Sequence, residues 1–212
     1  MKKAIIFDLD GTLWNSSEGV AKVWSNLANE LGLNTIVTGE TMRGCMGKVI
    51  EEIFDSIFPE QTSEIKSQFL SLCENKECDY LRQHGGALYP NLLEVLQTLH
   101  EHRDLYIVSN CQKGYIESFL TYHKLGVFFR DIECSGNTGQ PKASNIQLIM
   151  KRNHVKEAIY VGDTAGDQNS AQQAGIPFVY AAYGFGMVDT YDSKINSLQE
   201  LLSIVDTQNT SN

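Results

Sequence analysis

The chain has 212 residues, of which 42% are hydrophobic, and its formal net charge is −9. This length and composition are typical of one globular domain, or of a core with a small insert. Because nucleic acids and anionic membranes attract basic surfaces, the negative charge indicates that neither is a partner. A small anionic ligand stays possible, because a metal and local lysines can dominate the field inside a cleft.

Two further features of the sequence lead us to expect a cytoplasmic protein. The N-terminal apolar run Ala4–Phe7 is far too short for a secretory h-region, and no run approaches the length of a membrane span. The five cysteines are odd in number and include no C-x-x-C pair. This usage is typical of free thiols in a reducing compartment.

The first apolar run is followed directly by two carboxylates. Residues 3–8, which include the apolar run Ala4–Phe7, read as a buried first strand. Asp8 and Asp10 stand at its end, with Gly11 and Thr12 forming a turn behind them. Two acids at one strand end are costly to hold together unless a cation lies between them. A hard divalent metal such as Mg2+, which prefers oxygen ligands, would serve. The alternative is an acidic turn that caps the next helix.

After this motif the sequence turns helical. Apolar periodicity predicts helices over residues 17–32, 41–58 and 62–83, and no strand pattern is present between 15 and 84. We therefore expect the chain to cross to and from this insert at Leu13–Asn15 and His84–Gly86, where the glycines suit a hinge.

From Leu88 onward, helices and strands alternate. We predict strands at 105–109, 130–134, 158–162 and 178–181, and helices at 90–101, 113–123, 142–152, 166–174 and 196–205, with a loose tail from Asp206 to Asn212. Strands separated by helices imply an α/β fold with a doubly wound, mainly parallel sheet.

Three more polar motifs follow predicted strands or a turn. Ser109-Asn110 ends one strand, Gly162-Asp163 with Asp167 ends another, and Lys142 follows a Gly/Pro turn at the start of a helix. In an open parallel sheet, ligands bind outside the carboxyl ends of the strands. All these motifs, together with Asp8 and Asp10, are therefore expected to meet at one edge of the sheet.

In this order the motifs resemble those of the haloacid dehalogenase superfamily of phosphotransferases. That family carries Asp-x-Asp-Gly-Thr, a strand-terminal Ser/Thr, a Lys and Gly-Asp-x-x-x-Asp, and the match spans about residues 3 to 186. The resemblance implies a Rossmann-like catalytic core of residues 1–14 and 85–212, with an inserted all-helical cap of residues 15–84. By cap position and first motif, the chain is similar to the phosphoglycolate phosphatase subgroup of this family. The resemblance implies a Mg2+-dependent phosphatase that acts on a small phosphorylated metabolite.

The resemblance and the chemistry together suggest a role for each acid. Asp8 would be the nucleophile that forms a phosphoaspartate, and Asp10 would protonate the leaving oxygen and then activate water. By resemblance, the backbone carbonyl of Asp10 would also bind the metal. Asp163 is the natural third metal ligand, although it could simply cap a helix. Asp167 would complete the metal site, or orient Asp163, metal-bound water or Lys142.

The remaining candidates would bind phosphate or substrate. Ser109 and Asn110 offer a phosphate cradle at a helix start, with a simple N-cap as the alternative. Lys142 would neutralise phosphate and keep Asp8 ionised. Turn residues Gly11 and Thr12 would offer a backbone amide to phosphate. In the cap, Arg43 and Lys48 are each either substrate ligands or solvated charges.

Two other functions are compatible with these motifs. A sugar-phosphate mutase of the β-phosphoglucomutase type shares the nucleophile, the metal and the helical cap. A non-catalytic regulatory protein could use the same fold, but intact Asp8 and Asp10 argue against it. We expect a monomer or a weak homodimer.

Overall fold

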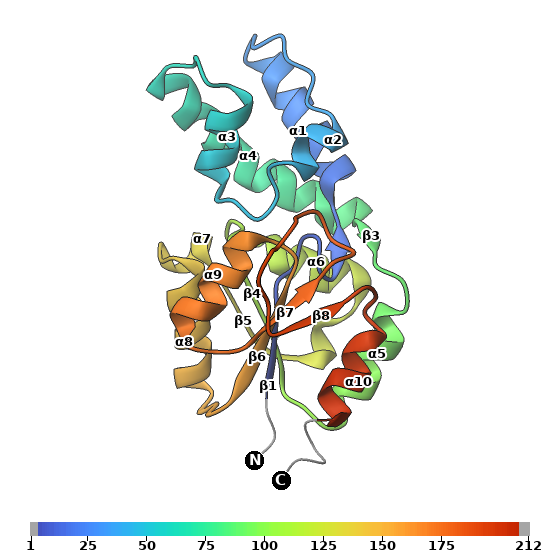
Figure 1. The fold of residues 1–212 in the computed structure, drawn as a ribbon. Helices are drawn as coiled ribbons and strands as arrows, with labels where there is room; N and C mark the ends of the chain where they lie inside the picture. Colours follow the sequence, from blue (N-terminus) through green and yellow to red (C-terminus); the bar gives the residue numbers. More distant parts are fainter. Residues whose placement is uncertain (1–3, 208–212) are drawn as a thin grey trace.

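The computed structural model describes residues 4–207, and its centre is a six-stranded sheet in the order β5-β4-β1-β6-β7-β8 (Figure 1). Every strand pairing in this sheet is parallel. Its strands are β1 (Ala4–Phe7), β4 (Leu105–Ser109), β5 (Phe129–Cys134), β6 (Ala158–Gly162), β7 (Phe178–Ala181) and β8 (Ser193–Ile195). The predicted doubly wound α/β class is confirmed.

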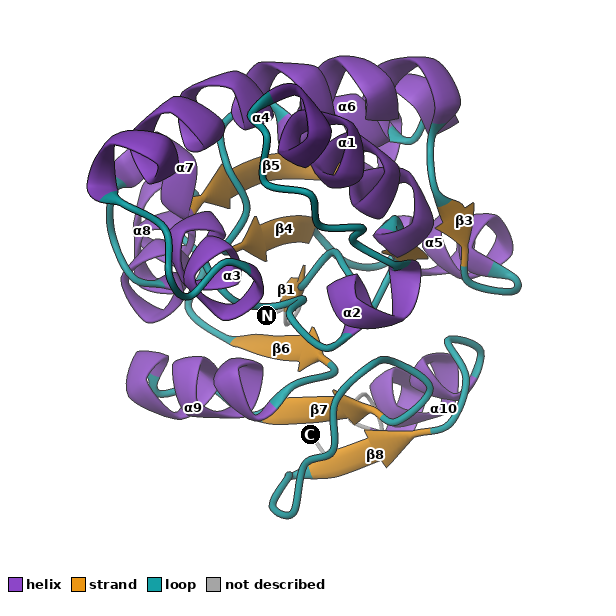
Figure 2. Ribbon diagram, turned by 90° about the horizontal axis from the view of Figure 1, so that it is seen from above, coloured by secondary structure: helices purple, strands orange, loops and turns teal. Residues whose placement is uncertain are grey.

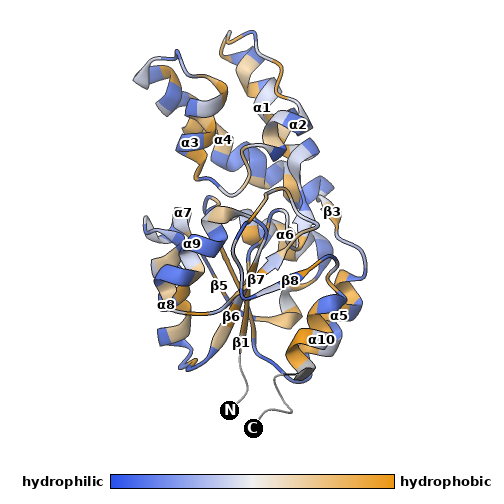
Figure 3. Ribbon diagram, in the orientation of Figure 1, coloured by the Kyte–Doolittle hydropathy of each residue, from blue (hydrophilic) through white to orange (hydrophobic). Residues whose placement is uncertain are grey.

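Helices cover both faces of the sheet, which explains why its central strands are continuous apolar runs. In β1, Ile5 and Phe7 point into one hydrophobic core, while Ala4 and Ile6 point into the other. The first core is completed by α5 (Leu92–His100), α6 (Tyr115–His123) and α10 (Glu200–Thr207). The second lies under α8 (Lys142–Arg152) and α9 (Ala165–Ala174), on the opposite side in Figure 2. The central strands are among the most hydrophobic parts of the ribbon (Figure 3).

Four helices lie beyond the carboxyl end of the sheet, at the top of Figure 1. They are α1 (Ser17–Glu30), α2 (Gly39–Arg43), α3 (Ile50–Ile57) and α4 (Ser63–His84). Their core is aromatic, with the Phe69 ring 5.0 Å from that of Trp24 and 5.1 Å from that of Phe54. Helix α4 also rests on α6, where the Ser118 hydroxyl donates to the Cys78 carbonyl at 3.0 Å.

A short antiparallel ribbon, which the sequence pattern does not reveal, joins these helices to the sheet. Strand β2 (Trp14–Asn15) pairs with β3 (Ala87–Leu88) where the chain leaves the core and returns to it. Two residues are too few to show a strand periodicity. Because Trp14 is fully buried, the ribbon is anchored in the core.

Most predicted boundaries agree with the structure to within one or two residues, and three departures change the description of the fold. The single helix expected over 41–58 is divided into α2 and α3, because residues 44–49 turn toward the sheet edge with Gly47 at φ +86°. The last helix begins at Glu200 instead of 196, after the unpredicted strand β8. It continues to Thr207, so the expected loose tail does not begin at Asp206, and its residues 208–212 lie outside the described part of the chain.

Two short elements complete the chain, a 3-10 turn at Gly126–Phe128 and α7 (Ser135–Thr138). Within residues 4–207, no helix combines the length and the apolar character that a membrane crossing requires. All five cysteines are free thiols.

Candidate active site

The carboxyl ends of three neighbouring strands bring the central site residues together. Asp8 follows β1, Ser109 ends β4, and Asp163 follows β6, and both β4 and β6 pair with β1. The backbone N–H of Asp8 still donates to the Val161 carbonyl at 2.8 Å, so the strand geometry fixes the first acid. Asp8 and Asp163 are almost fully buried, at 1% and 0% exposure.

A lysine joins two of the buried acids. Lys142 Nζ lies 2.8 Å from Asp8 Oδ1 and 2.6 Å from Asp167 Oδ1. Burial alone would lower the pKa of Lys142, but the Asp167 and Asp8 carboxylates raise that pKa well above its usual range. Lys142 is therefore a permanent cation in the floor of the site.

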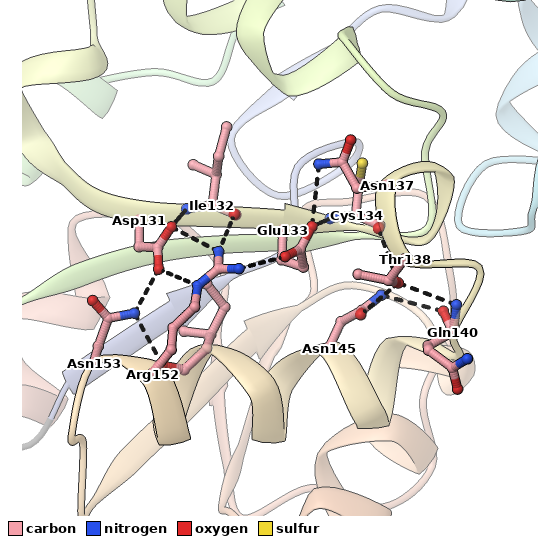
Figure 4. A network of polar contacts seen from close by, with 11 residues as sticks. Asp131, Ile132, Glu133, Cys134, Asn137, Thr138, Gln140, Asn145, Arg152 and Asn153 are labelled. Carbon is pink, nitrogen blue, oxygen red and sulfur yellow. Dashed lines mark hydrogen bonds and ion pairs between the residues drawn. The ribbon is translucent and has the colours of Figure 1, made fainter.

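Hydrogen bonds in the turn before α8, drawn in Figure 4, hold the start of the helix whose first residue is Lys142. The Thr138 hydroxyl donates to Asn145 Oδ1 at 2.8 Å, and the Asn145 amide donates to the Gln140 carbonyl at 3.2 Å. Asn145 is fully buried, so these bonds fix the path of the chain into the helix. Further along α8, Arg152 forms ion pairs with Asp131 and Glu133 on β5, which tie the helix to the sheet.

Asp163 is enclosed by the turns on either side of it. Gly11 has φ +83°, and a Cβ at this position would overlap the Asp163 carboxylate. The Thr12 hydroxyl donates to Asp163 Oδ1 at 3.3 Å, and the Phe185 N–H donates to Oδ2 at 2.7 Å. Burial raises the pKa of Asp163 well above its usual value, with the Asp167 and Asp8 carboxylates adding to the effect. Among the described residues this carboxylate has no ion pair.

Asp167 supports its neighbours as well as Lys142. Its Oδ2 accepts from the Thr164 N–H at 3.0 Å, the Thr164 hydroxyl at 2.7 Å and the Asp163 N–H at 3.2 Å. Thr164 in turn accepts from the Asp167 N–H, which completes a capping box at the start of α9. Asp167 thereby fixes the backbone that presents Asp163.

Asp10 has a different environment from these three acids. Its Oδ1 accepts from the Ser16 hydroxyl at 2.5 Å and from the Tyr115 hydroxyl at 3.1 Å. Burial raises the pKa of Asp10 to about 7, against the lowering effect of the Ser16 hydrogen bond. Burial also raises the pKa of Asp8, to about 6, although Lys142 opposes the change.

The donor set fits a hard divalent cation. Asp8, Asp163 and Asp167 each offer a carboxylate oxygen, and these oxygens lie within 4.8 Å of one another. Lys142 pairs with two of the three acids and leaves Asp163 without a cation among the described residues. Oxygen ligands and uncompensated negative charge are what Mg2+ requires. The Asp10 carboxylate is not part of this group. Asp10 could therefore contribute to a metal site only through its backbone carbonyl, the atom that the family resemblance implies.

A pocket extends from these acids into the helices above. On the sheet side it is lined by Asp8, Asp10, Ser109, Asn110 and Tyr115. The walls contributed by the upper helices are largely apolar and include Val20, Trp24, Met42, Met46, Ile50 and Ile53. A wider groove beside the pocket runs from Lys48 to Lys142 and opens the site to solvent.

Three predicted substrate ligands have other contacts. Arg43 forms a half-exposed ion pair with Glu18 at 3.0 Å and, among the described residues, lines neither the pocket nor the groove. Lys48 lines both, with Nζ 3.3 Å from the Ser56 hydroxyl. The Asn110 amide nitrogen donates to the Gly47 carbonyl at 2.8 Å, so this side chain connects the sheet edge to the loop after α2.

Sequence reasoning missed several residues of the site. Ser16 and Tyr115 hold Asp10, but no local sequence pattern marks them. A serine before a helix and a tyrosine on a helix are common in many other roles. Glu77 lines the pocket and is buried. Its signal is present in the sequence, because Cys73, Glu77 and Leu81 recur every four residues and so share the buried face of α4.

Fold and site together define an α/β protein with a buried carboxylate-lysine cluster at the carboxyl edge of a parallel sheet, beneath an inserted group of helices. The sequence pattern of the haloacid dehalogenase-like hydrolase family matches residues 5–181. The chain belongs to this family of hydrolases, as the motifs predict.

Individual relatives agree with this membership. Phosphoglycolate phosphatase of Vibrio vulnificus strain YJ016 is 26% identical, over 96% of each chain. A haloacid dehalogenase-like family hydrolase from Streptococcus pneumoniae superposes with a TM-score of 0.80 at 26% identity, over 96% of this chain and 98% of that one. A further such hydrolase, from Bacteroides fragilis, has a TM-score of 0.83 at 24% identity, over 95% and 100% of the two chains, and this likeness shows the fold alone.

Proposed function

We propose that this chain is a Mg2+-dependent phosphatase that hydrolyses a small phosphomonoester through a phosphoaspartate on Asp8. The observation that carries the proposal is that Asp8 is paired with a fixed cation, Lys142, and shares a pocket with a second carboxyl of raised pKa, Asp10. One acid is stabilised in its charged form by an ion pair, while the other can hold a proton near neutral pH. That division suits a nucleophile and a general acid.

The reaction then has two steps. In the first, a carboxylate oxygen of Asp8 attacks phosphorus, the bond from phosphorus to the ester oxygen breaks, and Asp10 gives its proton to the leaving oxygen. In the second, Asp10 takes a proton from water, the resulting hydroxide attacks phosphorus, and the acyl-phosphate bond breaks. Inorganic phosphate leaves, and both acids return to their starting forms.

The other residues of the site bind and orient the phosphoryl group. Lys142 stabilises its negative charge and keeps Asp8 ionised, and Ser109 at the end of β4 donates to a phosphoryl oxygen. Asp8, Asp163 and the Asp10 carbonyl would hold the metal, with Asp167 orienting Asp163 and Lys142. The metal, when bound, supplies positive charge against the phosphoryl oxygens.

The helices α1–α4 would act as the cap in this scheme. We assign residues 1–14 and 85–212 to a catalytic core and residues 15–84 to a cap that admits substrate and excludes water. The Asn110–Gly47 hydrogen bond supports this division, because it joins the cap loop to the core at the rim of the pocket. We expect the enzyme to act in the cytoplasm as a monomer or a weak homodimer.

The relatives' name, phosphoglycolate phosphatase, supports the reaction class more strongly than the substrate. At 26% identity the catalytic motifs can be retained while the pocket walls change. We therefore propose a phosphoglycolate phosphatase-like enzyme by mechanism and cap type. The preferred ester depends on the residues of this chain's own pocket.

Phosphate release from p-nitrophenyl phosphate and from a panel of small phosphomonoesters tests the proposal. We expect turnover with Mg2+, none with EDTA, and recovery when Mg2+ is restored.

Asp8→Asn should abolish turnover, because an amide is a poor nucleophile, whereas the exposed-acid control Asp189→Asn should retain it. Acid-quenched protein should carry label from a 32P-ester only when Asp8 is intact. Turnover by Asp8→Asn would contradict the covalent mechanism, and dependence on a bisphosphate activator would indicate a mutase.

A further inference from the structure

Glu77 is a buried carboxyl that the proposed mechanism does not use. It lies on α4 with 4% exposure, and its Oε2 accepts from Trp24 Nε1 at 3.0 Å and from Cys73 Sγ at 3.3 Å. Among the described residues it forms no ion pair, and no hydrogen bond reaches its Oε1. Burial raises the pKa of Glu77, against the effects of the Gln112 amide and of Trp24. An acid held in this way costs folding free energy, which points to a functional use.

A second polar group in the same pocket also lacks a partner. Gln112 is 6% exposed, and its Nε2 donates no hydrogen bond within residues 4–207. Glu77 and Gln112 both line the pocket that contains Asp8 and Asp10. The Gln112 amide lies close enough to Glu77 to lower its pKa, and both groups line a cavity whose other cap-side walls are largely apolar.

We propose that Glu77 and Gln112 bind a hydroxyl of the substrate's leaving group, so that the preferred substrate is a phosphomonoester of a small polyol or sugar. The inference rests on the proposed phosphatase function. A hydroxyl suits both partners, because it donates to the Glu77 carboxyl and accepts from the Gln112 amide. It can also accept from the protonated acid, so binding of the hydroxyl itself does not require Glu77 to be ionised.

Other leaving groups fit this pair less well. A carboxylate would be repelled by the acids of the pocket, and Lys48 is the single cation among the described residues that line it. An ammonium would suit Glu77 but would place donor against donor at Gln112. An alkyl group would leave both polar groups buried and unpaired, which a site built for hydrogen bonding penalises heavily. Phosphoglycolate, with its carboxylate, is therefore expected to be a poor substrate.

The test compares matched two- and three-carbon phosphomonoesters that end in a hydroxyl, an ammonium, a carboxylate or a methyl group. We expect kcat/KM for the hydroxyl esters to exceed that for the carboxylate and methyl esters by about 100-fold or more. Glu77→Gln should reduce the hydroxyl-to-carboxylate ratio at least about tenfold, since it removes the repelling charge while keeping an acceptor. Glu64→Gln, an exposed acid on the same helix, is the matched control and should leave the ratio unchanged.

A binding experiment with non-hydrolysable ligands tests this inference separately from the proposed phosphatase function. Calorimetry with Mg2+ compares 3-hydroxypropylphosphonate with 3-phosphonopropionate, which cannot be hydrolysed, and we expect the hydroxyl ligand to bind more tightly to the wild-type protein. Equal binding, or tighter binding of the carboxylate, would overturn the Glu77–Gln112 assignment. A preference for the ammonium ester would overturn the hydroxyl assignment. Absence of turnover for every ester, including p-nitrophenyl phosphate, would instead refute the phosphatase proposal.

Discussion

Two aspartates separated by a single residue, Asp8 and Asp10, acquire different chemistry from their surroundings. Asp8 follows a strand and faces Lys142, so its ionised form gains an ion pair. Asp10 lies beyond the strand and faces two hydroxyls, from Ser16 and Tyr115, and no cation of the described part of the chain pairs with it. Burial therefore raises the pKa of Asp10 further, to about 7, than that of Asp8, to about 6. Separation of two neighbouring pKa values is how one site obtains both a base and an acid.

Asp10→Asn tests the catalytic part of this difference. The amide keeps an oxygen that can accept from Ser16 and Tyr115, but it cannot transfer a proton. We expect kcat to fall by roughly 10²–10⁴-fold, the usual contribution of a positioned acid and base. Steady-state kinetics on p-nitrophenyl phosphate and on the preferred ester measures the loss. A change confined to KM would assign Asp10 to binding instead.

The same substitution should stabilise the metal-free protein at high pH. The raised pKa means that, between about pH 4 and pH 7, the folded state retains a proton that the unfolded chain releases. Rising pH across this window therefore lowers the free energy of unfolding, by about 1.4 kcal/mol per unit of pKa difference. In EDTA, Asp10→Asn should unfold at a higher temperature than the wild type at pH 8, and the difference should shrink at pH 4. If Asp10→Asn were instead less stable than the wild type at pH 8, burial of the ionised Asp10 would not be destabilising.

Among the secondary-structure elements, the connections between helices α1–α4 and the sheet are closely constrained. The loop of residues 44–49 touches the sheet edge through Gly47, and α4 ends at Gly85, whose φ of +66° and ψ of −165° suit glycine alone. A Cβ on Gly85 would overlap the ring of Tyr122. These contacts fix where the cap lies over the pocket.

Gly85→Ala should therefore be strongly destabilising, because it combines backbone strain with a side-chain clash. Gly32→Ala is the matched control, since Gly32 has φ +72° but no atom within 4 Å of an added Cβ. We expect the control to lose roughly 1–2 kcal/mol of stability from the left-handed backbone alone. Gly85→Ala should lose at least about twice as much. Urea unfolding of both variants measures the difference, and equal losses would mean that Tyr122 moves aside freely.

At the scale of the whole molecule, the buried aspartates gather where the strands end. The chain carries a net charge of −9, and within residues 4–207 four buried aspartates lie at one edge of the sheet with one buried lysine. Holding these buried carboxylates close together is unfavourable, but the parallel strands and the helix starts fix them in place. A divalent cation that binds only the folded state should recover part of the lost free energy.

Thermal unfolding with and without Mg2+ tests this whole-molecule expectation. At an Mg2+ concentration of about 100 times Kd, binding should stabilise the protein by about 2.7 kcal/mol. For a chain of this size, that is a rise in Tm of roughly 5–10 °C. Asp163→Asn should abolish most of the rise, whereas the exposed-acid control Asp189→Asn should retain it. A rise that survives in Asp163→Asn would place the metal elsewhere.

The sequence by itself determined the features that depend on local order. An apolar run followed by acids marks a strand end wherever it occurs, so the positions of Asp8, Ser109 and Asp163 at the carboxyl edge of the sheet could be predicted. The parallel α/β class could be predicted as well, because strand and helix periodicities alternate along the chain. The family follows from the order of the motifs.

Only the tertiary structure decided which groups meet. Lys142 contacts Asp8 across 134 positions of sequence, and Tyr115 contacts Asp10 across 105, so no local pattern reveals either pairing. The break between α2 and α3 depends on the core surface that the loop touches, and the direction of Glu77 depends on the helices that enclose α4. These features arise from packing between distant segments, where burial and hydrogen-bond geometry select one partner among many that the sequence allows.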